Sequence, residues 1–286
     1  MQHAQRFFLL LALPGAALLS CSRQAAPEAE PAVQPSNEIV LQVDAGFEVN
    51  AKGDATALSS LPSSLFWGGS TGSSGSETQK WAATSQTVSS GQIHTGAYQT
   101  YTPTSYNYYV ANQTFTVGTS ATMTVAGNTV DIISGHTAAS NSTTPSITLG
   151  HIFARTGTLT MNTQEGYTIS GISWTIVGKG DLQGTAGTYN MTSDSWTSAS
   201  AKLTTATAIT GSSDKYLIPG TYTVACTYTL TKGDYTHTFT KSADVTLVQG
   251  KINHITGTAS GGNAQEIVLT VTLTDWGTTT LTPTFS

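Results

Sequence analysis

Residues 221–231, TYTVACTYTLT, decide the fold class. Every second side chain from Tyr222 to Leu230 is apolar or aromatic, and threonine or alanine fills the positions between them. This two-residue period is typical of a strand with one buried face. The next residues, KGD at 232–234, have turn chemistry, and aromatic side chains resume in phase at Tyr235, so this region predicts a hairpin.

Composition extends this prediction to the whole chain of 286 residues. Only 9% of the residues are charged, against about a quarter in ordinary globular proteins. A chain poor in lysine, arginine, glutamate and leucine cannot build many surface helices, whereas threonine, valine, isoleucine and tyrosine favour strands. We therefore expect an all-β protein. The net charge of −5 and the absence of a basic stripe make nucleic acid an unsuitable partner.

Further strands are predicted where short alternating segments are bounded by Gly, Asn, Ser or Pro. No segment shows a sustained helical period. A change of phase across Gly171 predicts a bulge. The predicted strands are residues 39–49, 106–110, 114–117, 121–125, 129–133, 146–149, 152–161, 167–176, 243–248, 252–256 and 266–274, and residues 65–67 form a short apolar segment.

The N-terminal residues 1–20 have the architecture of a secretory signal, with an apolar run too short to span a bilayer. Cys21 follows Leu18-Leu19-Ser20, which resembles the lipobox of bacterial lipoproteins, so Cys21 is the expected site of acylation. An ordinary secreted protein with a cysteine at this place is the alternative. Residues 21–38 are Pro-rich and predict an extended tether.

No motif in the sequence requires an enzyme, a cofactor or a metal. GGSTG at residues 68–72 matches the nucleophile elbow G-x-S-x-G, but no amphipathic helix is predicted after it, so a chance match is the better interpretation. The six histidines are scattered, and no acid or base partner is visible near them. Cys226 lies on the apolar face of its predicted strand and is expected to be a buried, inert thiol.

A group of aromatic residues leaves two interpretations open. They could form a sugar-stacking platform of a glycan-binding surface lipoprotein, or they could fill the core of a β-sandwich. The group comprises Trp67, Trp81, Tyr98, Tyr101, Tyr106, Tyr108 and Tyr109.

Three stretches together resemble the fimbrillin family, the subunits of type V pili. The first is Cys21 with its tether and the strand at 38–49. The second is residues 146–161, SITLGHIFARTGTLTM, with the family's H-x-x-A-R pattern in His151, Ala154 and Arg155. The third runs from Leu217 to Trp276 and includes LIPGTY, QGKINHI and VTLTDW.

This resemblance implies two tandem transthyretin-like β-sandwich domains, at residues 39–162 and 163–286. It also implies a lipoprotein on the surface of the outer membrane that becomes a structural and adhesive pilus subunit. The implied partners are other pilus subunits, the outer membrane through the lipid anchor and, in the alternative hypothesis, surface glycans.

Polymerisation in the family proceeds by strand exchange after a trypsin-like protease releases the first strand, here residues 39–49. Lys52 is the only basic residue between Arg23 and Lys80, so it is the candidate processing site, and an uncleaved anchor subunit is the alternative. The implied donor is residues 266–286, whose apolar positions alternate like a strand for a one-sided groove. These donor positions are Ile267, Leu269, Val271 and Leu273.

Overall fold

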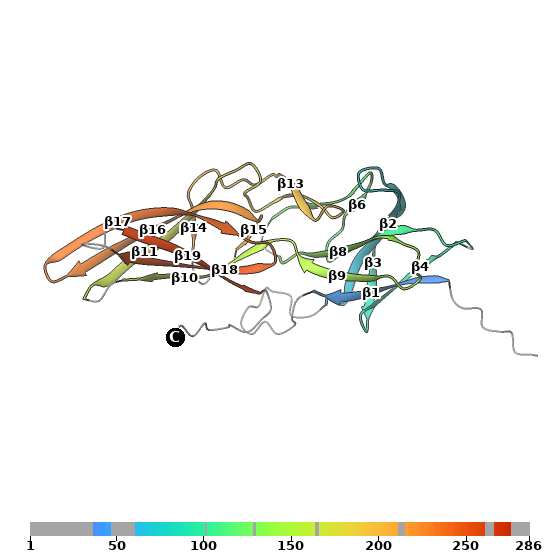
Figure 1. The fold of residues 1–286 in the computed structure, drawn as a ribbon, viewed down its shortest axis with the longest axis horizontal. Coiled ribbons are helices and arrows are strands. Elements are labelled where there is room, and N and C mark those ends of the chain that lie inside the picture. Colours follow the sequence, from blue (N-terminus) through green and yellow to red (C-terminus); the bar gives the residue numbers. More distant parts are fainter. Residues whose placement is uncertain are drawn as a thin grey trace, which may run out of the picture. The chain divides into compact units, whose positions relative to one another are not determined.

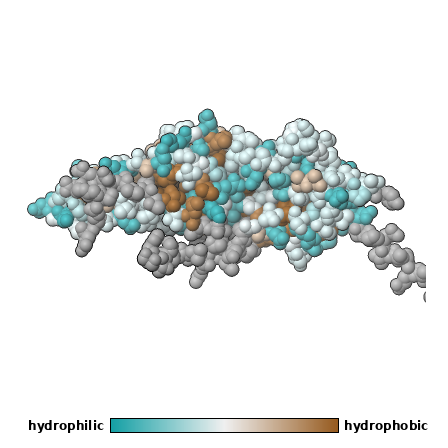
Figure 2. Space-filling model, viewed as in Figure 1, coloured by the Kyte–Doolittle hydropathy of each residue, from teal (hydrophilic) through white to brown (hydrophobic). Residues whose placement is uncertain are grey.

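A computed structural model describes residues 37–46, 61–100, 102–127, 130–163, 166–210, 215–260 and 266–275. Every regular element in these ranges is a strand, so the predicted all-β class is confirmed (Figure 1). None of the described residues forms a helix that is long and apolar enough to cross a membrane. The described surface in Figure 2 is mostly pale or teal, which fits a chain rich in threonine, serine and glycine.

The first half of the chain forms a closed barrel. The strand order is β1-β4-β3-β2-β5-β8-β9, and β1 closes the barrel by pairing antiparallel with β4 and parallel with β9. One buried cluster fills the interior and includes side chains of β1, β2, β5 and β9. The strands are β1 (Glu38–Ala45), β2 (Ser64–Thr71), β3 (Thr78–Ser89), β4 (Gln92–Tyr98), β5 (Tyr106–Ala111), β8 (Ile133–Ser140) and β9 (Ser146–His151).

Two four-stranded sheets share a second core. Their orders are β15-β10-β18-β19 and β14-β11-β16-β17, and one buried cluster draws side chains from both. The first sheet contains β10 (Ala154–Asn162), β15 (Tyr216–Leu217), β18 (Lys251–Ser260) and β19 (Glu266–Asp275). The second contains β11 (Thr168–Gly178), β14 (Thr207–Ile209), β16 (Gly220–Lys232) and β17 (Tyr235–Leu247).

The predicted hairpin is confirmed as β16 and β17. The five alternating side chains of β16, from Tyr222 to Leu230, are fully buried, and Gly233 takes a left-handed φ of 58° in the turn. On the opposite face, threonines of the two strands hydrogen-bond in pairs, as in Thr227 Oγ1 to Thr240 Oγ1 at 2.8 Å. These hydroxyl pairs stabilise the exposed face of the hairpin without charges.

The bulge predicted at Gly171 is also confirmed. Gly171 has a φ of 60°, and the register between β11 and β16 shifts between Ser170 and Ser173. Trp174 and Ile176 point into the core as expected. Ile172 has the same alternation phase as Trp174 but is 44% exposed, because it lies within the bulge, where the alternation of faces is broken.

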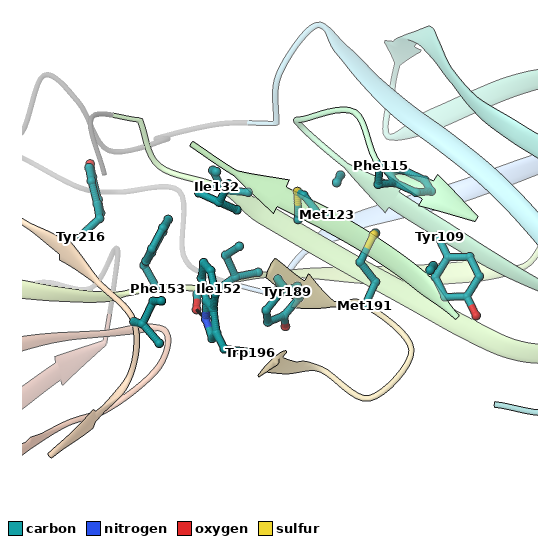
Figure 3. Close-up of a cluster of buried hydrophobic side chains, with 14 of the residues drawn as sticks. Tyr109, Phe115, Met123, Ile132, Ile152, Phe153, Tyr189, Met191, Trp196 and Tyr216 are labelled. Carbon is teal, nitrogen blue, oxygen red and sulfur yellow. Dashed lines mark hydrogen bonds between the residues drawn. The ribbon is translucent and has the colours of Figure 1, made fainter. Parts of the chain in front are cut away.

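A fourth sheet, β13-β12-β7-β6, covers the third core cluster (Figure 3). It contains β6 (Thr116–Val117), β7 (Ala121–Val125), β12 (Gly187–Asn190) and β13 (Ser195–Ala199). In this cluster Trp196 packs on Phe153 with ring centroids 5.0 Å apart, and Trp196 Nε1 donates to the carbonyl of Ile152 at 3.0 Å. The indole therefore fills apolar space while its single donor is satisfied.

Two sheets combine strands from both sides of the domain boundary predicted between residues 162 and 163. β7 pairs with β12, and β10 pairs with β18. The boundary itself stays a prediction.

The strand predicted at 129–133 is wrong in its limits, because β8 begins only at Ile133. Asp131 lies outside any strand and is fully buried.

Candidate strand-exchange site

β1 lies in a slot between β4 and β9 and is hydrogen-bonded along both edges. The N–H of Val43 donates to the carbonyl of Gly91 at 2.7 Å, and the N–H of Gln42 donates to the carbonyl of Pro145 at 2.9 Å. Release of β1 would leave unpaired backbone groups on both neighbours, which is the condition for accepting another strand.

Three side chains of β1 point into the barrel core. Ile39 and Leu41 are 0% exposed, and Val43 is 2% exposed. Between them, Val40 and Gln42 are half-buried and Asp44 is exposed, so β1 has one buried and one outer face. The strand observed ends at Ala45, and residues 47–49 of the predicted strand lie outside the described residues.

Polar contacts fix the start of β1 against β4. Glu38 Oε1 accepts from the backbone N–H of Gly96 at 3.2 Å, and Glu38 Oε2 lies 3.4 Å from Nδ1 of His94. Thr95 Oγ1 donates to the carbonyl of Ile39 at 2.6 Å. These contacts were not predicted, because Glu38 and His94 are 56 residues apart and nothing in the local sequence connects them.

The predicted donor residues lie on β19, the last strand of its sheet. Among the described strands β19 is hydrogen-bonded only to β18, so its other edge is open. Val271 packs against the second core, whereas Leu273 is 45% exposed. Ile267 and Leu269 belong to the same strand. The two other predicted site residues, Cys21 and Lys52, lie outside the described residues.

Ser70, the serine of the GGSTG match, lies in β2 and is followed by β3, not by the helix that a nucleophile elbow requires. Ser70 is fully buried, and its hydroxyl donates to Glu77 Oε2 at 3.0 Å. The glycines have a packing role, since a Cβ at Gly69 would lie 2.7 Å from Cε3 of Trp81. The motif is therefore structural, as the sequence interpretation favoured.

Glu77 is the centre of a buried hydrogen-bond network. Besides Ser70, it accepts from the hydroxyls of Tyr109 at 2.6 Å and Thr192 at 3.2 Å, both at Oε1. Burial, followed by the hydrogen bond to Glu77, raises the pKa of Tyr109 to about 12. Asn107 Nδ2 adds a bond to Ser70 Oγ at 3.1 Å. The network connects β2, β5 and the turn after β12, which are distant in the sequence.

Most of the aromatic group belongs to cores. Trp67, Tyr106, Tyr108 and Tyr109 are buried, and Trp81 is half-buried with its ring stacked 6.2 Å from that of Tyr108. This burial fits the core interpretation.

The other two aromatic residues do not change this interpretation. Tyr98 is 63% exposed, and Tyr101 lies outside the described residues. The described rings therefore do not form the exposed, coplanar platform that glycan binding by this group would need.

The H-x-x-A-R segment contributes a buried ionisable pair. His151 Nδ1 lies 2.9 Å from Asp131 Oδ2, and both side chains are almost fully buried. The sequence showed no acid partner near any histidine, and the fold supplies this one by bringing together residues 20 positions apart. Ala154 and Arg155 are also buried.

Metal-ligand and thiol side chains were the remaining candidates for chemistry. No group of three or more His, Cys, Asp or Glu among them could hold a metal ion. Cys226 is fully buried, as predicted, and burial raises the pKa of its thiol to about 11.

By fold, the chain is similar to adhesion and fimbrial proteins. A solved structure of a candidate cell adhesion protein from Parabacteroides distasonis ATCC 8503 matches 86% of this chain and 99% of its own, with a TM-score of 0.55 and 10% sequence identity. The predicted resemblance is thus confirmed as a likeness of fold over most of the chain.

Other solved structures match at lower TM-scores. A fimbrilin from Porphyromonas gingivalis W83 is 9% identical, covers 84% of this chain and 98% of its own, and has a TM-score of 0.42. A fimbrial assembly protein from Parabacteroides distasonis ATCC 8503 is 11% identical, covers 84% of this chain and 99% of its own, and has a TM-score of 0.43. No family model and no curated protein matches the chain.

Proposed function

We propose that this chain is a structural and adhesive pilus subunit that polymerises by β-strand exchange at the cell surface. One observation carries the proposal: β1 is an N-terminal strand that fills a slot between β4 and β9 and supplies three buried side chains to the barrel core. The two-domain, transthyretin-like organisation at residues 39–162 and 163–286 is part of the same proposal.

The energetics of the slot favour replacement over an empty barrel. Burying a side chain such as Ile, Leu or Val contributes about 1.5 to 3 kcal/mol, so the three buried side chains of β1 contribute roughly 5 to 9 kcal/mol as an upper limit. A barrel without β1 loses this contribution and exposes two strand edges. A donor strand with the same alternation restores both, and the resulting joint dissociates slowly.

Residues that flank β1 supply the location and the trigger in this proposal. Acylated Cys21 anchors the chain in the outer membrane, and the Pro-rich tether, which was predicted to end at residue 38 and gives way to β1 at Glu38, holds the folded body away from it. Cleavage after Lys52 frees β1 for exchange. In the alternative form, an uncleaved chain keeps β1 and acts as the anchor of the pilus.

The proposal is tested with donor-strand variants in cells that produce the chain. Leu269→Asp places a charge on the face of the donor strand that enters the slot. When material sheared from the cell surface is run on detergent gels, this variant should lack the ladder of detergent-resistant oligomers. Thr272→Asp adds the same charge to the opposite, exposed face and should leave the ladders unchanged.

A second variant guards against misfolding. Leu273 is already 45% exposed, so Leu273→Asp should leave the melting temperature of the monomer almost unchanged while it still reduces polymer. If both Leu269→Asp and Leu273→Asp formed normal polymer, the proposed exchange would be contradicted.

A further inference from the structure

β1 and β19 have nearly the same sequence, although they lie near opposite ends of the chain. Residues 38–43 read EIVLQV and residues 266–271 read EIVLTV, and each hexapeptide begins at the first residue of its strand. They differ only where Gln42 corresponds to Thr270. Two strands that merely share one buried face need only have apolar side chains at every second position. These two segments also share the order Ile, Leu, Val on that face and the Glu and Val on the other face.

We infer that residues 266–271 of one copy replace residues 38–43 of a second copy, residue for residue and in the same direction. This inference rests on the proposed strand exchange and adds the register and direction of the inserted strand. Ile267 takes the pocket of Ile39, Leu269 that of Leu41 and Val271 that of Val43. Because each pocket receives a side chain of identical shape, the barrel core needs no repacking.

Glu266 fixes the register of the inserted strand. In the slot, the carboxylate of Glu38 accepts from the N–H of Gly96 and lies beside Nδ1 of His94. Glu266 meets the same two groups when the strands are aligned by their sequences. A slip by one residue would turn the apolar side chains outward, and a slip by two would put Val268 at this polar position. Of these three registers, only the aligned one buries the apolar side chains and also places a carboxylate beside Gly96 and His94.

The single difference lies outside the core. Gln42 is half-buried, and its Oε1 accepts from Gln92 Nε2 at 3.3 Å. Thr270 is too short to reproduce this contact, but it is β-branched and suits a strand. Inside the barrel, the inserted strand thus keeps the apolar side chains that β1 supplies and loses one hydrogen bond at a partly exposed position, a contact of small net value.

Disulfide trapping in assembled material tests the register. Gln92 lies directly opposite Gln42, so Gln92→Cys should cross-link subunits when combined with Thr270→Cys in the same full chain. Val268→Cys and Thr272→Cys are matched controls, because they share the face of Thr270 but lie two residues away. Directly opposite Cβ atoms are within disulfide range, whereas a two-residue offset places them about 7 to 8 Å apart. Cys226 is buried and does not compete.

The expected result is at least tenfold more intersubunit disulfide from the 92–270 pair than from either control pair, on non-reducing gels of sheared polymer. Preferential cross-linking of 92–268 or 92–272 would show exchange in another register and would overturn this inference alone. Polymer without cross-linking in any pair would show that β19 of this chain does not occupy the slot. Absence of detergent-resistant polymer from the unsubstituted chain would overturn the proposed function itself.

Discussion

Glu77 is a buried glutamate that has a structural role. Its two carboxylate oxygens accept hydrogen bonds from three hydroxyl groups, of Ser70, Tyr109 and Thr192. A polar group is tolerated in a protein interior only when its hydrogen-bonding atoms have partners, and here both carboxyl oxygens have them. The network therefore connects β2 and β5 of the barrel to the turn after β12.

Removal of this carboxylate should destabilise the chain. Glu77→Ala leaves three hydroxyls without their acceptor, and we expect the free energy of unfolding to fall by about 2 to 4 kcal/mol. Urea denaturation followed by tryptophan fluorescence measures the change. Asp181→Ala is the control, because the side chain of Asp181 is 98% exposed. Equal stability of the two variants would mean that the network contributes little.

Buried tyrosines predict the behaviour of the fold in alkali. Burial is the main cause that raises the pKa of Tyr109 to about 12, and it raises the pKa values of Tyr108, Tyr189 and Tyr222 further. Above the unfolded pKa of about 10, the unfolded chain loses these protons while the folded chain keeps them. The stability present below about pH 10 should therefore decrease as the pH rises toward 12.

The measurement is the urea midpoint as a function of pH, together with tyrosinate absorbance. The midpoint should be constant at neutral pH and fall steeply above about pH 10, with the absorbance change coinciding with unfolding. A midpoint that stays constant as these tyrosines ionise would contradict the raised pKa values.

At the level of secondary structure, prediction succeeded where one strand face is buried throughout. The hairpin of β16 and β17 and the bulge at Gly171 were predicted because alternation, turn residues and the change of phase are local properties of the sequence. β3 was not predicted, because its residues TQKWAATSQTVS carry no regular apolar face. Pairing with β2 and β4 holds β3 in the barrel, and such pairing is invisible in the sequence of β3.

The candidate site was predicted in part. The first strand and the apolar donor positions follow from alternation and from the family resemblance. The two edges of the slot could not be predicted, since β4 and β9 lie about 50 and 100 residues away from β1. The hexapeptide shared by β1 and β19 was visible in the sequence, but six residues are too few to indicate a repeat. Its meaning depends on the structure, which places one segment inside the barrel and the other at the end of a sheet.

The slot also predicts how β1 contributes to the unassembled fold. Leu41→Ala removes a fully buried side chain from the barrel core and should lower the free energy of unfolding by about 2 to 5 kcal/mol. Asp44→Ala, on the exposed side of the same strand, should change it by less than about 0.5 kcal/mol. Thermal or urea unfolding of the two purified variants compares these values. Similar stabilities would show that β1 is not part of the folded core.

For the whole molecule, the decisive prediction concerns the N-terminus of assembled subunits. The sequence of residues 50–62 is rich in turn formers and predicts a loop, and loops are preferred sites of proteolysis. We expect mass spectrometry of sheared polymer to find chains that begin at Gly53. Chains that still begin at acylated Cys21 would identify an anchor subunit that keeps β1.

In a Cys21→Ser variant, neither acylation nor retention in outer membranes is expected.

The parallel pairing of β1 with β9 would give the proposed assembly a direction. If the replacement strand runs the same way as β1, as we infer, each subunit would join the polymer in a single orientation. Such a polymer is polar: one terminus carries an unfilled barrel and the other an unused C-terminal strand. The two ends are then chemically distinct, so elongation and capping can be controlled separately, and two growing polymers cannot join head to head.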